Sequence, residues 1–161
     1  MKNKTVAGIV LIILLLSIIV FIALSSHIKT LGLEIVDIKV EEPKPSLSNS
    51  RYIAIDPGES VILGVTVQNK GDNITHRAAY SVGIEVIDPD KGDEYWQLPS
   101  EQLIWIDLGP EGESSHTFKM RNKKELPFSG KFEIQAYIKS AKTGEEIARS
   151  DKVTIEIKYP A

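Results

Sequence analysis

Residues 131–139 read Lys-Phe-Glu-Ile-Gln-Ala-Tyr-Ile-Lys, and this stretch decides the fold class. Its apolar side chains recur at every second position, at Phe132, Ile134, Ala136 and Ile138. Charged or polar side chains take positions 131, 133, 135 and 139. Since successive side chains of a β-strand point to opposite faces, this alternation predicts a strand with one buried face and one solvated face.

The same period of two recurs along most of the chain. It predicts further strands around Leu33–Val40, Val61–Gln68, Tyr80–Val86, His116–Met120 and Val153–Ile157. A slip in the alternation at Val36 and Asp37 indicates a β-bulge in the first of them. Turn residues lie between the strands, and Pro57 followed by Gly58 is typical of a type II turn.

Residues Leu103–Leu108 are apolar on both faces except for Asp107, which predicts a buried strand. Trp96 and Trp105 are expected to anchor the core or a loop, and either could instead line a sugar site. In total the pattern predicts an all-β fold, an immunoglobulin-like antiparallel β-sandwich of seven or eight strands. Alternation, in place of continuous apolar runs, argues against a parallel sheet.

A transmembrane α-helix is expected before this domain. Residues Val6–Leu24 carry no charge and span about 28 Å as a helix, close to the hydrocarbon thickness of a bilayer. The expected organisation is a cytoplasmic N-terminus at 1–5, a signal anchor at 6–24, a linker at 25–32 and an extracellular domain at 33–161. A cleaved signal peptide is the alternative, because Ala23-Leu24-Ser25 resembles a cleavage site.

The charges near the N-terminus predict the orientation of the chain. Lys2 and Lys4 precede the apolar segment, so the positive-inside rule keeps the N-terminus in the cytoplasm and puts the C-terminal domain outside the cell. Removing these two from the 19 basic residues leaves 17 against 22 acidic ones, a formal charge of −5. An acidic domain of this kind is not expected to bind nucleic acid.

No catalytic residue and no cofactor are predicted. The chain has no cysteine, which excludes disulfides and zinc–thiolate sites. Its histidines, His27, His76 and His116, are far apart in the sequence. Ser114-Ser115-His116 brings a hydroxyl next to an imidazole, but neighbours on a strand face opposite ways. They are interpreted as polar strand residues.

Two further site candidates remain. The acidic turn offers Asp88, Asp90, Asp93 and Glu94 as oxygen ligands for Ca²⁺, although it departs from the EF-hand pattern and a solvated turn is the simpler interpretation. Asn73-Ile-Thr75 is an N-glycosylation sequon in an expected external turn. A second sequon at Asn3 falls on the cytoplasmic side.

A family resemblance rests on two stretches. Residues 56–72 read Asp-Pro-Gly-Glu-Ser-Val-Ile-Leu-Gly-Val-Thr-Val-Gln-Asn-Lys-Gly-Asp, and residues 108–114 read Leu-Gly-Pro-Glu-Gly-Glu-Ser. They resemble the CARDB-type cell-adhesion modules and related immunoglobulin-like repeats of archaeal and bacterial surface proteins. The resemblance covers about half of the expected external domain. It implies a binding or spacer role and no catalytic residues.

Three functions are compatible with these expectations. The first is a membrane-anchored binding or scaffold module that engages another envelope protein. It would bind through a sheet edge or through the loops around Asn69–His76 and Asp88–Leu98. The second is an accessory subunit of a surface appendage or membrane complex. The third, from another class, is a carbohydrate- or Ca²⁺-binding domain associated with an enzyme.

Overall fold

In the computed structural model the chain divides into two units, residues 1–30 and residues 31–161. The structure describes residues 32–45, 49–88, 92, 94–123 and 130–158, all in the second unit. The expected cytoplasmic end, 1–5, and membrane span, 6–24, lie outside these residues. Among the helices in the described part of the chain, none is long and apolar enough to cross a membrane.

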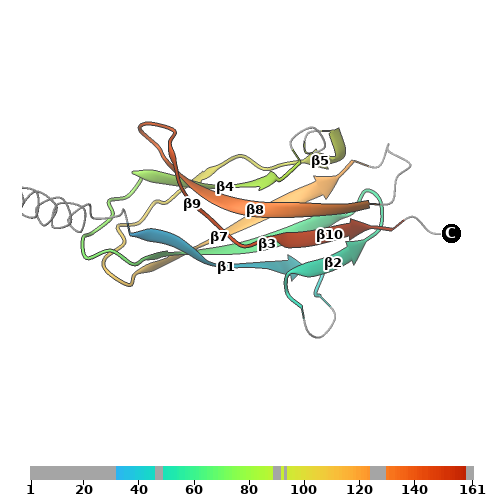
Figure 1. Ribbon diagram of the computed structural model, residues 1–161, viewed down its shortest axis with the longest axis horizontal. Coiled ribbons are helices and arrows are strands. Elements are labelled where there is room, and N and C mark those ends of the chain that lie inside the picture. Colours follow the sequence, from blue (N-terminus) through green and yellow to red (C-terminus); the bar gives the residue numbers. More distant parts are fainter. Residues whose placement is uncertain (1–31, 46–48, 89–91, 93, 124–129, 159–161) are drawn as a thin grey trace, which may run out of the picture. The chain divides into compact units, whose positions relative to one another are not determined.

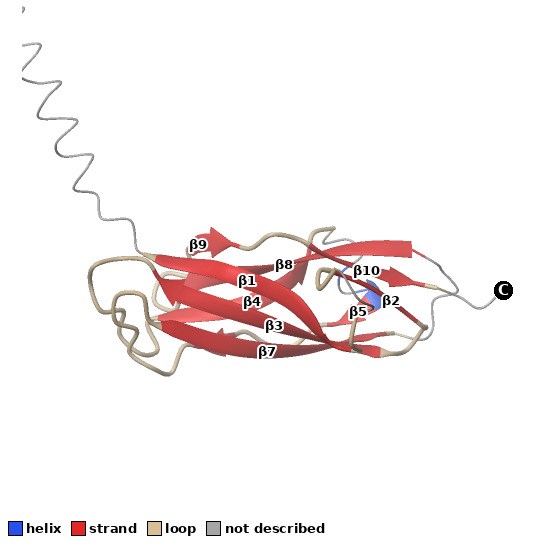
Figure 2. Cartoon of the chain, turned by 90° about the horizontal axis from the view of Figure 1, so that it is seen from below, coloured by secondary structure: helices blue, strands red, loops and turns tan. Residues whose placement is uncertain are grey.

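The described residues form ten strands in two sheets (Figure 1). In spatial order, the first sheet contains β1 (Leu33–Glu42), β3 (Ser60–Asn69), β7 (Glu113–Asn122) and β5 (Trp96–Gln97). The second contains β2 (Tyr52–Ile55), β10 (Val153–Ile157), β8 (Gly130–Ser140), β4 (Tyr80–Val86) and β6 (Gln102–Leu103), with β9 (Glu146–Arg149) paired to β8. In Figure 2, β1, β3 and β7 lie side by side, with β3 between the other two.

The inward faces of both sheets share one hydrophobic core, which confirms the all-β sandwich. Alternate residues of β8 are buried at Phe132, Ile134, Ala136 and Ile138, as the period of two predicts. From the first sheet come Val61, Leu63, Val65 and Val67 of β3 and Phe118 and Met120 of β7. Trp96 completes the core at one end, only 1% exposed, with its ring edge-on to Phe132.

Two local features confirm predictions made from the sequence. The register of β1 against β3 shifts between Ile35 and Asp37, where the alternation slips, so a β-bulge lies there. Gly58 has a φ of 84° and the Glu59 N–H donates to the Asp56 carbonyl at 3.2 Å. A positive φ at this position of the turn is what a type II turn requires, and glycine adopts it without strain.

The sandwich is not wholly antiparallel, and it has more strands than expected. β2 pairs with β10 in parallel, with Ile53 opposite Ile155. β2, β5, β6 and β9 have two or four residues each, so they are too short for alternation to mark them. All other strand pairs in the described residues are antiparallel.

The prediction of a buried strand at Leu103–Leu108 is wrong. Only Leu103 belongs to a strand, β6, and the segment beyond it lies along residues 75–80 through isolated backbone hydrogen bonds. Ile104 and Leu108 face the core, whereas Trp105 is 68% exposed and Ile106 is 50% exposed. An apolar run predicts burial only if a neighbouring element covers both of its faces, and here one face stays open.

Candidate binding groove

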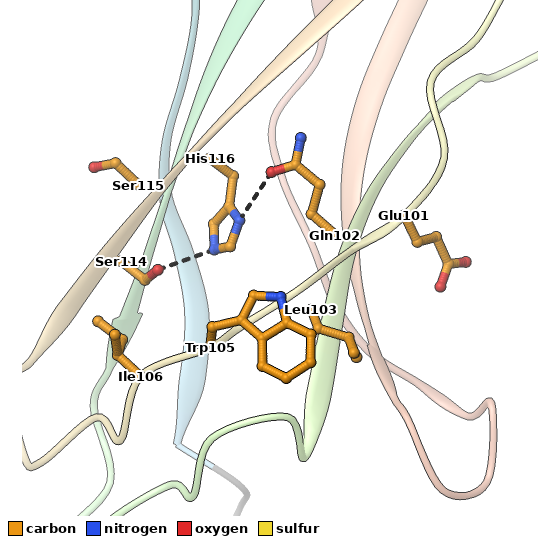
Figure 3. Close-up of a pocket in the computed structure, with 8 residues that line it drawn as sticks. All are labelled: Glu101, Gln102, Leu103, Trp105, Ile106, Ser114, Ser115 and His116. Atoms are coloured by element: carbon orange, nitrogen blue, oxygen red, sulfur yellow. Dashed lines mark hydrogen bonds between the residues drawn. The ribbon is translucent and has the colours of Figure 1, made fainter.

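A groove lies along one edge of the sandwich, between the two sheets. It is lined by Glu101, Gln102, Leu103, Trp105, Ile106, Ser114, Ser115 and His116 (Figure 3). We call this set the edge groove. Its volume is about 520 Å³, within the range of about 300–1,000 Å³ that is usual for ligand sites.

The path of the chain between the sheets creates the edge groove. After β5 pairs with the end of β7 in the first sheet, the chain continues through residues 98–101 to β6, which pairs with β4 in the second sheet. Residues 101–106 therefore face β7 across the sandwich edge. The Gln102 side chain bridges the two sides, because its Nε2 donates to the Thr117 carbonyl of β7 at 2.8 Å.

The rim of the edge groove is apolar. Large exposed hydrophobic side chains are few among the described residues: Val36, Ile74, Trp105 and Ile106. Of these, Trp105 and Ile106 are neighbours in sequence and both line the edge groove. Contiguous exposed apolar side chains mark interaction sites, and tryptophan is among the residue types enriched at binding hot spots.

The floor of the edge groove is a short row of hydrogen-bonded polar side chains. The His116 imidazole, 7% exposed, lies between Ser114 Oγ, 3.0 Å from Nε2, and Gln102 Oε1, 3.4 Å from Nδ1 (Figure 3). The side-chain amide nitrogen of Gln102 already donates to Thr117, so the amide oxygen of Gln102 accepts a hydrogen bond from His116 Nδ1–H. Nε2 of His116 then accepts a hydrogen bond from the Ser114 hydroxyl, which assigns the tautomer of the imidazole.

The charge state of this floor follows from burial. Desolvation lowers the pKa of His116 below its usual value, because removing an imidazolium from water disfavours the charged form. The imidazole is therefore neutral at pH 7. The floor offers hydrogen-bonding groups and no positive charge.

Glu101, on the opposite wall, is hydrogen-bonded to side chains of the second sheet. Its carboxylate accepts hydrogen bonds from Ser81 Oγ at 2.8 Å, the Tyr137 hydroxyl at 2.9 Å and Lys139 Nζ at 3.2 Å. The Ser81 bond is the largest cause that lowers the pKa of Glu101, and those from Tyr137 and Lys139 add to it. This carboxylate is held ionised as part of the wall, so it does not serve as a proton donor near pH 7.

One pair at the site was missed at the sequence level. Ser114 and His116 are two residues apart on β7, so they share a face and hydrogen-bond to each other. The rule that strand neighbours face opposite ways holds for Ser115 and His116, one exposed and one buried, but it does not separate Ser114 from His116. The i, i+2 spacing was the signal that could have found the pair. Gln102 carried no signal, because its contact with His116 spans two sheets.

The other predicted site residues lie elsewhere or cannot be placed. Asp88 and Glu94 are exposed, whereas Asp90 and Asp93 lie outside the described residues. Among the residues that the structure does describe, no group of three or more acidic, histidine or cysteine side chains could hold a metal ion. The calcium site therefore stays a prediction. His76 is exposed, His116 belongs to the edge groove, and His27 is not among the described residues.

Asn73 lies exposed in the turn that follows β3. The turn is held by Asn69, 1% exposed, whose Nδ2 donates to the carbonyls of Asn73 at 2.7 Å and Leu108 at 2.8 Å. Thr75 pairs with Leu108 through two backbone hydrogen bonds of 2.8 Å. The Asn73 sequon thus sits on an anchored turn, and its glycosylation stays a prediction.

Comparisons with known proteins bear on the fold alone. No family model matches the sequence, and no curated protein matches it. Among solved structures, the CARDB domain of a Pyrococcus furiosus protein, crystallised with di-metal ions, is 16% identical with a TM-score of 0.46. The match covers 78% of this chain and 90% of that domain. Its solution structure matches at 15% identity and a TM-score of 0.45, over 78% of this chain and 94% of the domain.

A Niemann-Pick type C2 protein from the Japanese carpenter ant is also similar. It is 13% identical with a TM-score of 0.47, and the match covers 79% of this chain and 93% of that protein. The CARDB modules that the sequence resembles are thus among the solved structures to which this chain is similar.

Proposed function

We propose that this chain is a non-enzymatic binding module of the cell envelope. In this proposal residues 6–24 hold it in the membrane, the domain lies outside the cell, and the edge groove binds another envelope protein. The observation that carries the proposal is the exposure of Trp105 and Ile106 next to each other, at 68% and 50%. Exposing two such side chains to water is unfavourable unless a partner covers them.

The chemistry of the edge groove supports recognition over catalysis. Its imidazole is hydrogen-bonded to an amide oxygen at Nδ1. The carboxylate among its lining residues, Glu101, accepts hydrogen bonds from Ser81, Tyr137 and Lys139. Hydrolytic serine sites orient the base through a third group, usually a carboxylate, and stabilise an oxyanion. Exposed apolar side chains next to neutral hydrogen-bonding groups suit a protein-binding surface, where aromatic residues are enriched and charged residues are depleted.

Two further functions stay as alternatives. An accessory subunit of a surface appendage or membrane complex would use the same groove against a fixed neighbour in the assembly. A carbohydrate-binding domain is favoured by one observation, the exposed Trp105 indole beside Gln102 and Ser114, since sugar rings stack on aromatic faces.

Site-specific photo-crosslinking in native membranes tests the proposal. A photoreactive phenylalanine is introduced at Ile106, at Ser115 and, as a matched control, at Thr143, which is exposed in the turn between β8 and β9. We expect mass spectrometry to identify one and the same envelope protein from positions 106 and 115, and not from 143. Equal capture at all three positions, or no protein at 106 and 115, would show that the edge groove is not the binding surface.

A further inference from the structure

Along the edge groove, β7 has no strand partner among the described residues on its outer side. β3 pairs with β7 from Ser60–Arg121 to Gln68–Glu113, without a break in register. On the other side, β5 pairs only with Asn122 and Arg121. In the described residues, no strand pairs with that side of β7 from Glu113 to Met120.

Known hydrogen bonds fix which backbone groups of β7 face this open side. The Asn122 N–H donates to Glu59 on the β3 side, and the Lys123 N–H donates to Tyr95 on the β5 side. The N–H and C=O of successive strand residues point to alternate sides. The backbone N–H and C=O groups of the odd-numbered residues of β7 therefore point to the side without a strand partner. The Thr117 carbonyl agrees, since it accepts from Gln102 there.

The N–H groups of Ser115 and Thr117 are therefore directed along the open side next to the edge groove. In the described part of the chain, neither N–H donates to a protein group. An edge of this kind is a template on which another strand can add.

Side chains on the two faces of β7 define what such a strand would carry. On the inner face, next to Ser114 and His116, an added side chain would meet Trp105 and Ile106. On the outer face, the Glu113 carboxylate is exposed and, within the described residues, makes no hydrogen bond or ion pair. A basic side chain opposite Glu113 would complement it, and opposite charges in directly paired positions stabilise a sheet.

We propose that the edge groove binds an extended segment of the protein partner, which adds to β7 as an antiparallel strand. Its apolar side chains pack on Trp105 and Ile106, and a basic side chain pairs with Glu113. The antiparallel direction follows β3 and β5, both antiparallel to β7, and antiparallel pairing is slightly more stable per residue. This inference rests on the proposed function, since it names the kind of segment that the edge groove takes.

Synthetic peptides provide the direct test, with the full chain in detergent micelles. The probe is a fluorescein-labelled peptide in which Val alternates with Thr and Lys, and fluorescence anisotropy reports its binding. In an antiparallel addition with Val facing the edge groove, the N–H groups of the Thr and Lys residues point toward β7. N-methylation at those positions should weaken binding at least about tenfold. N-methylation at the Val positions, the matched control, should have little effect.

Two pairs of variants test the protein side. Ser115→Pro removes an N–H from the open side but none from the β3 ladder, whereas Ser115→Ala keeps that N–H. We expect Ser115→Pro to lose binding and Ser115→Ala to retain it, with circular dichroism checking the fold. Glu113→Lys should reverse the preference for peptides with Lys over matched peptides with Glu. The N-methylated peptides do not depend on any variant folding.

Each outcome decides between strand addition and its rivals. Equal loss from both N-methylated peptides, or no loss from either, would overturn strand addition. Loss only from methylation at the Val positions would overturn the antiparallel direction. Quenching of Trp105 fluorescence by chito- or cello-oligosaccharides, with no binding of the alternating peptide, would show that the edge groove binds a glycan and not a peptide strand. If crosslinking identifies a partner yet the peptide fails to bind, this inference is wrong and the proposed function stands.

Discussion

Tyr137 of β8 lies across Gly83 of β4, its partner in the sheet register. A Cβ built on Gly83 would lie 2.4 Å from both the ring Cζ and the hydroxyl oxygen of Tyr137. The absence of a side chain at Gly83 lets the ring lie against the backbone, where Tyr137 is only 8% exposed. Its hydroxyl then donates to Glu101 at 2.9 Å. Gly83 thereby helps to position one wall of the edge groove.

A double-mutant cycle on this pair is the first prediction. Gly83→Ala forces the Tyr137 ring away, and we expect it to lower the free energy of unfolding by about 1–3 kcal/mol. In a Tyr137→Ala background the same change should be close to neutral, because the clash is gone. Urea denaturation of residues 31–161, which form a separate compact unit, measures both. An equal cost in the two backgrounds would show that the ring is not what Gly83 accommodates.

The second prediction concerns the core. Ile134 and Ile155 are both 0% exposed, on the adjacent strands β8 and β10. Ile134→Ala or Ile155→Ala should cost about 2–5 kcal/mol of unfolding free energy. Glu133→Ala should stay within about 0.5 kcal/mol, because Glu133 is exposed and loses only a surface ion pair with Lys152. Equal effects at Ile134 and Glu133 would contradict the assignment of faces.

The third prediction is a pH dependence. The pKa of Glu101 is lowered, chiefly by the hydrogen bond from Ser81. A carboxyl whose folded pKa is depressed contributes stability above its unfolded pKa, about 4.3, and loses it as pH falls through the folded value. Glu101→Gln should thus lower the free energy of unfolding by roughly 0.2–1 kcal/mol at pH 7, the size usual for a charged group in contact with solvent. Near pH 3 the loss should be smaller.

Glu113→Gln is the matched control for the substitution itself. In the described residues Glu113 makes no hydrogen bond or ion pair, so its replacement should change the free energy of unfolding at pH 7 by no more than about 0.5 kcal/mol. Urea midpoints measured from pH 3 to pH 7 give the comparison. Parallel curves for Glu101→Gln and the unmodified domain would contradict the prediction.

The faces of the long strands were predictable because one side of each is in water. Alternation at Phe132–Ile138 reports that difference directly, and the slip at Val36 marked the bulge for the same reason. The parallel pair of β2 and β10 was not predictable, since a four-residue strand such as Tyr52–Ile55 carries too short a pattern and nothing local specifies its neighbour.

The edge groove was less predictable than the sheets. The run at Leu103–Leu108 reports apolar character but not which neighbours cover it, so Trp105 and Ile106 were expected to be buried and are exposed. Their exposure depends on where the chain passes between the sheets, which is a long-range property. The pair of Ser114 and His116 was within reach, because a spacing of two on a strand places side chains on one face.

The fourth prediction concerns topology, which the described residues do not test. Lys2 and Lys4 should keep the N-terminus in the cytoplasm, so protease added to intact cells should degrade the C-terminal domain. Lys2→Glu with Lys4→Glu should weaken this orientation. The readout is a C-terminal epitope tag probed before and after permeabilisation. A tag that is protected until the membrane is opened would show that the domain lies inside.

The last prediction is that Ser114 is not a nucleophile, although its hydroxyl lies 3.0 Å from His116 Nε2. A neutral imidazole accepts this proton, but Nδ1 faces the Gln102 amide oxygen at 3.4 Å, so no negative charge stabilises an imidazolium as it forms. Burial lowers the His116 pKa, which opposes that step further. A fluorophosphonate probe should therefore leave Ser114 unlabelled over hours at pH 7–8, with a serine hydrolase in the same tube as positive control. His116→Gln should change peptide binding and leave probe labelling at background. Labelling of Ser114 that His116→Gln abolishes would instead establish a reactive serine and defeat the binding-module proposal.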